Sequence, residues 1–330
     1  MVKENNDSSL DNAIKSLNKK YGGSSLIQVK DSDDGRLSIE SIPTGCFSLD
    51  RVFGCGGLPK GRIIELFGQE SSGKSSLALY IAAQIQKTKG KVLWIDAEFA
   101  FSKEYAEKLG VDINSLIVSQ PESGEEAFDV ISNIAQTGEI DLIVVDSVAA
   151  LLPQSELEGG IDQQGMAVQA RLVGRGLRLL AGSLSRSKTT VIFINQLREK
   201  VGVFYGKKEI TPGGKSLKFF SSVRLQVKKG AEIKDADGAI IGNTMIVQGV
   251  KNKVGLPWRT AEFDIYYAAG IDVVSDLFNE SVRSGVIEKT GNTYSLGEVK
   301  LGVGEGASKK YLGQDEKLQK EIKKVLTNKK

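Results

Sequence analysis

The middle of the chain repeats short apolar runs that alternate with amphipathic stretches of helical length. Uninterrupted apolar runs are typical of strands buried on both faces of a mostly parallel sheet. Four such runs predict core strands, at residues 62–67, 91–96, 141–146 and 189–195. Three later segments alternate more and are predicted to extend the sheet, at residues 223–229, 243–250 and 261–267. The pattern therefore predicts an α/β core with helices on both faces of the sheet.

The N-terminal segment carries one apolar stripe at helical spacing, from Leu10 to Tyr21. This stripe predicts a short amphipathic helix that begins near Ser8 and is stopped by Gly22 and Gly23. A polar linker follows. The apolar face must be buried against a partner surface, either the chain's own core or a neighbouring subunit, and the pattern leaves both open.

After Gly270 the chain changes to short, charged elements, and it closes with a helix predicted at residues 315–327. We interpret this change as a separate C-terminal lobe. The predicted organisation is an N-terminal helix and linker (1–37), an α/β core (38–271) and a lobe (272–330).

Composition narrows the possible functions. The 330 residues include 44 Lys and Arg against 41 Asp and Glu, so a nucleic-acid partner requires a local basic cluster rather than global charge. The chain has two cysteines and no histidine, which argues against a structural zinc site and a histidine-based triad. Isolated thiols suit a reducing cytosol, so we expect a cytoplasmic protein. No apolar signal core and no run of about 18 apolar residues is present, so no membrane partner is expected.

The segment GQESSGKS fits the phosphate-binding pattern G-x-x-x-x-G-K-[ST] and lies between a predicted strand and a predicted helix. Its amides and the helix N-terminus favour phosphate oxygens. Lys74 is predicted to bridge the β- and γ-phosphates, and the Ser75 hydroxyl to bind Mg²⁺. The guanine-reading N-K-x-D motif is absent, which disfavours a GTPase. The predicted nucleotide-binding residues are Gly68, Gln69, Glu70, Ser71, Ser72, Gly73, Lys74, Ser75 and Ser76.

Polar residues follow three other predicted strands. Asp146 suits the Mg²⁺ site, with a helix N-cap as the alternative. Glu98 and Asp96 both suit activation of the attacking water, and the alternation of a strand does not choose between them. Gln196 could sense the γ-phosphate, or be a solvated loop residue. Because parallel strands end at one edge of a sheet, we expect these groups to lie near the phosphates.

Two segments have the composition of polyanion-binding loops. Residues 158–171 form a Gly/Gln-rich stretch that leads into a helix, on which Arg171, Arg175 and Arg178 make a basic stripe. Residues 196–218 are glycine-rich and contain more basic than acidic residues. A solvated surface loop is the alternative for either segment. The second segment begins at Gln196, which suggests that the nucleotide state and the grip on a polyanion are coupled.

The chain resembles the bacterial RecA recombinases over roughly residues 8–312. The motifs that carry the resemblance are GGLPKGRIIELFGQESSGKSS, IDAEFA with YAEKLGVD, LIVVDSVAALLPQSELEG, FINQLREKVGVFYG, TPGGKSLKFFSSVRL and VKNKVG. The resemblance implies a RecA-type P-loop ATPase core with a mostly parallel sheet, an N-terminal helix that docks on the next subunit, and a small α+β C-terminal lobe.

The resemblance also implies an activity. A protein of this kind is a DNA-dependent ATPase that forms a helical filament on single-stranded DNA. It pairs that strand with homologous duplex DNA and exchanges strands in recombinational repair and the SOS response. A self-cleaving repressor is a further implied partner. The implied cofactors are ATP and Mg²⁺.

Residue roles follow from the same resemblance. Glu98 is implied as the residue that activates water, Gln196 as the γ-phosphate sensor and Tyr105 as the ring that stacks on adenine. Lys251 and Lys253, which otherwise read as solvated lysines at a strand end, are implied to reach the ATP of a neighbouring subunit. Residues 158–166 and 197–211 match the two DNA-binding loops. The DNA-contact positions are Met166, Arg171, Arg178, Arg198, Val201, Gly213 and Gly214.

Four positions depart from the family pattern. Phe99 stands where His is common, and Ser102 where an Asp usually contacts adenine, which predicts softer adenine selectivity. Pro212 replaces a frequent Thr and is expected to stiffen the second loop. Glu305 replaces a Lys of the C-terminal lobe, which questions duplex capture there, and the sequence has no acidic tail.

Two other functions remain as alternatives. A ring-shaped helicase or motor would use the same core, but the N-terminal helix and linker favour a filament. A P-loop kinase for a small molecule would need a lid and an acceptor pocket, which the basic loops fit poorly.

Overall fold

The computed structural model describes residues 4–21, 26, 39–159, 166–199 and 209–328. They belong to two compact units, Met1–Glu40 and Ser41–Lys330. In the first unit, α1 spans Glu4–Lys20, so it begins earlier than the predicted cap at Ser8. Leu10, Leu17 and Tyr21 of its apolar stripe are exposed, and docking on the next subunit stays a prediction.

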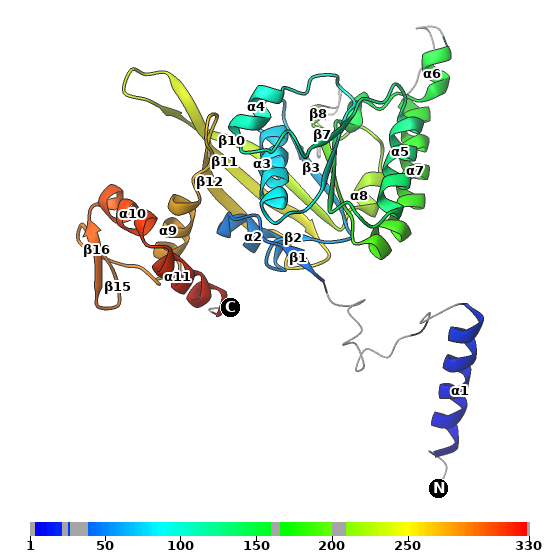
Figure 1. Ribbon diagram of the computed structural model, residues 1–330, viewed down its shortest axis with the longest axis horizontal. Helices are drawn as coiled ribbons and strands as arrows, with labels where there is room; N and C mark the ends of the chain where they lie inside the picture. The colour runs from blue at the N-terminus through cyan, green and yellow to red at the C-terminus, as the bar shows by residue number, and fades with distance from the viewer. Residues whose placement is uncertain (1–3, 22–25, 27–38, 160–165, 200–208, 329–330) are drawn as a thin grey trace. The chain divides into compact units, whose positions relative to one another are not determined.

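The second unit is built on a nine-stranded sheet in the order β13-β12-β11-β10-β3-β7-β6-β4-β5 (Figure 1). Six neighbouring strands are parallel, and three antiparallel strands extend the sheet from β10. The parallel strands are β3 (Ile63–Gly68), β4 (Val92–Asp96), β5 (Ile117–Ser119), β6 (Leu142–Asp146), β7 (Thr190–Gln196) and β10 (Val223–Lys234). The antiparallel strands are β11 (Ile240–Asn252), β12 (Thr260–Tyr266) and β13 (Gly270–Ile271). The predicted sheet and its extension are confirmed.

Strands β10 and β11 are longer than predicted. Their hairpin extends beyond the layered core (Figure 1). Side chains there are mostly exposed on both faces, so the apolar pattern that marks a strand is lost and only the backbone ladder continues.

Helices cover both faces of the sheet, as predicted. Leu77 and Ile81 of α3 pack with Trp94 in one apolar core, and Ile131 of α5 and Leu177 of α7 lie in a second. The helices of this unit's core are α2 (Phe47–Phe53), α3 (Lys74–Lys87), α4 (Lys103–Lys108), α5 (Gly124–Gln136), α6 (Gln154–Glu158), α7 (Met166–Ser187) and α8 (Ser216–Phe220). Short elements complete it: β1 (Ser41–Ile42), β2 (Leu58–Pro59), the 3₁₀ turn Val148–Ala150, β8 (Arg198–Glu199) and β9 (Glu209–Ile210).

The C-terminal part has its own small core, in which Phe278 and Tyr294 meet edge to face with ring centroids 5.1 Å apart. Leu312 and Ile322, from the last two helices, pack in the same core. Its elements are α9 (Val273–Arg283), β14 (Glu288–Thr290), β15 (Thr293–Leu296), β16 (Val299–Val303), α10 (Glu305–Gln314) and α11 (Glu316–Asn328). The predicted α+β lobe is confirmed, and its last helix is within one residue of the prediction.

Candidate nucleotide site

The phosphate-binding segment connects the buried strand β3 to α3 at the carboxyl edge of the parallel strands. Ser71 and Gly73 have positive φ values of 56° and 88°. A Cβ atom on Gly73 would lie 2.6 Å from the Cε of Met245, so this turn requires glycine. The Lys74 amine folds back and donates to the carbonyl oxygens of Gly68 (3.2 Å) and Gln69 (2.7 Å).

Burial and nearby carboxylates act in opposite directions on the pKa of Lys74. Burial lowers the pKa of Lys74, while Asp146, Glu98 and Glu70 favour its charged form. Burial raises the pKa of Asp146 to about 6, the Ser75 hydroxyl bonded to it opposes that shift, and Glu98 adds to it. A hydroxyl beside a carboxyl group is a hard oxygen donor set, which fits Mg²⁺.

Asp96 and Glu98 have different environments although they are two residues apart. Strand β4 ends at Asp96, which is 2% exposed and accepts from the N–H groups of Ala100 (3.1 Å) and Phe101 (3.1 Å) and from the Gln120 amide (2.8 Å). Glu98 is exposed, and its Oε1 accepts from the hydroxyl of Ser147 at 2.5 Å. Asp96 therefore organises the turn, and Glu98 is free to meet a water molecule.

The strand register brings the other predicted groups to the same edge. Gly68 pairs with Gln196, and Asp96 with Asp146. The Gln196 amide nitrogen lies 3.5 Å from Glu98 Oε1, and the N–H of Leu197 donates to Gly68 O at 3.0 Å. The predicted proximity of these strand ends is thus observed.

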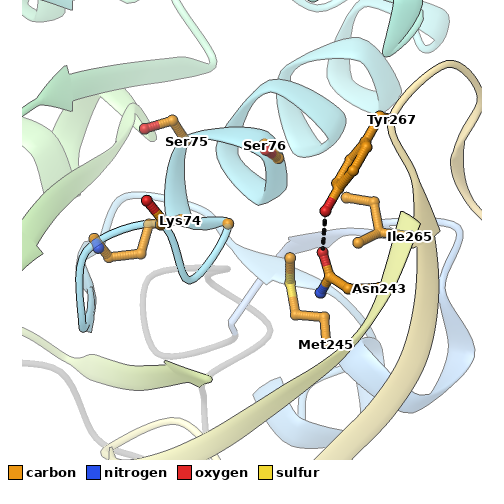
Figure 2. Close-up of a pocket in the computed structure, with 9 residues that line it drawn as sticks. Lys74, Ser75, Ser76, Asn243, Met245, Ile265 and Tyr267 are labelled. Carbon is orange, nitrogen blue, oxygen red and sulfur yellow. Dashed lines mark hydrogen bonds between the residues drawn. The ribbon is translucent and has the colours of Figure 1, made fainter. Parts of the chain in front are cut away.

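A cavity of about 230 Å³ opens beside the phosphate-binding segment. On one side lie residues 71 and 73–76; Asn243, Met245, Ile265 and Tyr267 of the antiparallel extension and its edge line the other (Figure 2). The Tyr267 hydroxyl donates to Asn243 Oδ1 at 3.3 Å. The sequence prediction missed these four residues. Their period-two spacing was the available signal, but the register Asn243↔Ile265 aligns the two pairs, and the cavity lining places them opposite the start of α3.

Tyr105 reaches the same region from α4, where its hydroxyl lies 2.7 Å from the Ser76 hydroxyl. Ser102 caps that helix by accepting the N–H of Tyr105 at 3.2 Å. Phe99 is exposed with a φ of 54°. Ser102 thus has a structural role as a helix cap.

Lys251 and Lys253 lie at the other end of the parallel strands, near the ends where those strands begin. Lys251 pairs with Arg224 near the start of β10, whereas the phosphate-binding segment follows the end of β3. The Lys251 amine donates to the carbonyls of Lys218 (2.5 Å) and Phe219 (3.0 Å) at the end of α8, and burial lowers its pKa. Lys253 is exposed. Neither amine is beside its own chain's phosphate-binding segment.

The predicted DNA contacts are partly described. Arg171 and Arg178 are exposed on α7, and Gly213 and Gly214 have φ values of 79° and 72°. Met166 begins α7 and Arg198 lies in β8. Val201, and residues 160–165 and 200–208 of the two predicted loops, lie outside the described residues.

Pro212 and Glu305, the two other positions that depart from the family pattern, both lie in the described part of the chain. Pro212 accepts from the Asn195 amide at 3.1 Å through its carbonyl, so its backbone is held at the base of the second loop. Glu305 begins α10 and pairs with Lys309 at 2.6 Å. Within the described ranges, no helix is both long and apolar enough to cross a membrane.

Comparison with known proteins covers nearly the whole chain. The RecA N-terminal domain matches residues 8–272, and the RecA C-terminal domain matches residues 275–330. Protein RecA of Chlorobium chlorochromatii (strain CaD3) is 47% identical over 319 residues, which cover 96% of this chain and 90% of that protein. Protein RecA of Thermus aquaticus is 47% identical over 326 residues, which cover 98% and 95%. By these matches, the chain belongs to the RecA family.

Proposed function

We propose that this chain is an ATP-dependent recombinase that assembles on single-stranded DNA and exchanges strands with homologous duplex DNA. Membership of the RecA family supports a role in recombination and DNA repair, with ATP and DNA as ligands. The observation that carries the ATPase is the meeting of Glu98, Ser147 and Gln196 beside Lys74 and Asp146.

Glu98 is the proposed base, because its carboxylate is exposed and fixed by the Ser147 hydroxyl. Lys74 leaves its two loop carbonyls to bind the triphosphate when ATP enters. Ser75 and Asp146 would hold Mg²⁺, which when bound neutralises part of the triphosphate charge. The predicted segment 68–76 then supplies backbone donors to phosphate oxygens.

Gln196 is the proposed γ-phosphate sensor. It lies between Glu98 and the start of the second predicted loop. Its N–H is held by Asn195, whose amide also binds the carbonyl of Pro212 at the other end of that loop. A shift of Gln196 toward phosphate would therefore move the backbone at both ends of the loop.

The base of ATP is assigned to the cavity beside Tyr105. Tyr105 is proposed to stack on adenine, and Asn243 and Tyr267 supply polar groups at the cavity wall. These two side chains are proposed to hydrogen-bond the base in place of Ser102, whose hydroxyl caps α4.

Lys251 and Lys253 are proposed to complete the site of a neighbouring copy in a head-to-tail filament. Their place at the opposite edge of the sheet supports this role, because a heterologous contact joins two different edges. The N-terminal helix is proposed to dock on the same neighbour. A cytoplasmic location, a part in the SOS response and action on a self-cleaving repressor belong to the same proposal.

Single-stranded DNA is proposed to bind along Arg171, Arg178, Arg198 and the Gly213–Gly214 pair, together with Met166 and Val201. The exposure of the two α7 arginines supports phosphate contacts, so binding should weaken with salt. The test is ATP turnover with and without single-stranded DNA, followed by strand exchange between a circular strand and a linear duplex. Stimulated turnover with strand exchange is expected. Turnover that ignores DNA would contradict the proposal.

A further inference from the structure

The C-terminal lobe joins the core through a cluster of carboxyl groups between α2 and α9. Asp276 and Glu280 lie one turn apart on α9 and are 1% and 6% exposed. Asp50 of α2 belongs to the same cluster, since the charge of Asp276 raises the pKa of Asp50. Acidic side chains are seldom this deeply buried unless they are fully paired.

Hydrogen bonds from Ser48, from the Cys46 thiol and from the Phe47 N–H lower the pKa of Asp276, but burial outweighs them and raises it. Its Oδ2 accepts the N–H of Ser48 at 3.1 Å. Its Oδ1 is buried and has no hydrogen-bond partner in the part of the chain that the structure describes. The buried thiol of Cys46 faces the same carboxyl group. A charged carboxylate with one unpaired oxygen is unfavourable in such a place.

The other two carboxyl groups have partners of their own. Asp50 Oδ1 accepts from the N–H (2.9 Å) and the hydroxyl (2.6 Å) of Thr44. Glu280 pairs with Arg51 of α2 at 2.7 Å and with Arg283 of α9 at 3.0 Å. The Arg51 pair therefore draws α2 and α9 together, whereas ionised Asp50 and Asp276 repel each other across the same joint.

Other elements contribute the remaining groups around the cluster. Lys323 of α11 favours the charged form of Asp50, and burial keeps the Tyr80 hydroxyl of α3 neutral by raising its pKa. The charge of Asp50 also raises the pKa of the Cys55 thiol. A cavity of about 210 Å³ beside α9 adds Glu262 and Asp264 of β12. These acidic neighbours reinforce the excess of negative charge.

We propose that this cluster is a proton-linked latch, which holds the C-terminal lobe on the core while Asp50 and Asp276 are protonated and loosens the lobe as these two groups ionise. The proposal concerns the joint between α2 and α9 and is independent of ATP hydrolysis.

The direction of the pH effect follows from linkage. Burial raises the pKa of Asp50 from 3.8 to about 7, and burial also raises the pKa of Asp276. Groups whose pKa is raised in the docked form stabilise docking below their free values and lose that contribution as the pH rises through the docked values. The joint should therefore weaken from about pH 4 to about pH 7, by up to roughly tenfold per pH unit for each proton released.

The test is hydrogen exchange of the full chain at pH 5.5 and 7.5, corrected for the intrinsic pH dependence of exchange. Peptides from α2 and α9 should lose about tenfold or more protection at the higher pH, while peptides from β6 keep theirs. Asp50→Asn and Asp276→Asn should each reduce this pH dependence. Asp129→Asn, an exposed carboxyl group on α5, should leave it as in the unmodified chain.

The pH dependence decides the outcome rather than the protection at one pH, so a variant with a weaker joint is still informative. The proposal is overturned if α9 protection in the unmodified chain does not change with pH. It is equally overturned if both Asp50→Asn and Asp276→Asn keep the pH dependence of the Asp129→Asn control.

Discussion

Glu98 and Asp96 owe their separate roles to the backbone turn that follows β4. Asp96 is still within the buried strand and accepts three hydrogen bonds, while Glu98 lies beyond it and accepts from Ser147 and Gln196 through one oxygen. A buried, saturated carboxylate cannot bind a water molecule, and an exposed one anchored on one oxygen can.

Replacing Glu98→Gln should lower the ATP turnover number by on the order of 10²–10⁴-fold and leave ATP and DNA affinity unchanged, because the side chain keeps its shape but loses its basicity. Steady-state turnover and equilibrium binding of a fluorescent nucleotide check this. Glu298→Gln, on the exposed surface of the lobe, is the control. Normal DNA-stimulated turnover in Glu98→Gln would refute the assignment.

Replacing Asp96→Ala should instead act on stability. It leaves the N–H groups of Ala100 and Phe101 and the Gln120 amide without their acceptor, which costs about 3 kcal/mol of unfolding free energy. Denaturant unfolding measures the difference. Glu98→Ala should change stability far less, and equal losses in the two variants would count against this division of roles.

At the scale of elements, a buried polar network ties three strands together at the centre of the sheet. Glu65 of β3 is 0% exposed, binds Arg224 of β10 and accepts from the Asn195 amide of β7 at 3.0 Å. Asn195 also holds Gln196 and Pro212, so the network fixes both ends of the second predicted DNA loop. A satisfied network of this kind rigidifies the elements it joins.

Replacing Glu65→Ala should lower the unfolding free energy by about 3–5 kcal/mol, because the largely buried Arg224 loses its counter-charge. Thermal or denaturant unfolding checks the value. Glu232→Ala, which removes an exposed pair with Lys229, should change stability by less than about 1 kcal/mol. Losses of similar size in both variants would contradict the central place of this network.

The elements that the sequence predicted well are those with strong local signals. The runs at 91–96 and 141–146 are apolar because both faces are covered, and they became β4 and β6 almost residue for residue. The cavity residues Asn243 and Tyr267 could not be predicted, because their meeting depends on the pairing of two strands and on their packing near α3. The strand pattern alone likewise did not choose between Asp96 and Glu98; the family resemblance implied Glu98, and the burial of Asp96 supports that choice.

At the scale of the whole molecule, the proposed ATPase machinery is divided between two edges of one sheet. Glu98, Lys74 and Asp146 lie at the carboxyl edge, and Lys251 and Lys253 at the other. One copy therefore presents a site that has the proposed base but lacks Lys251 and Lys253. A head-to-tail assembly would combine the two halves at every contact.

The most direct test of this claim mixes two inactive variants. One is Glu98→Gln, which keeps both lysines. The other is Lys253→Glu, which keeps Glu98; it is preferred to a change at Lys251, because Lys251 also caps the end of α8. DNA-stimulated ATP turnover is measured for each variant alone and for a 1:1 mixture.

Each variant alone should be almost inactive, and the mixture should recover roughly one quarter of the normal turnover, since that share of random head-to-tail contacts joins an intact base to intact lysines. Normal turnover in Lys253→Glu alone would contradict the account. So would a mixture no more active than the sum of its two parts.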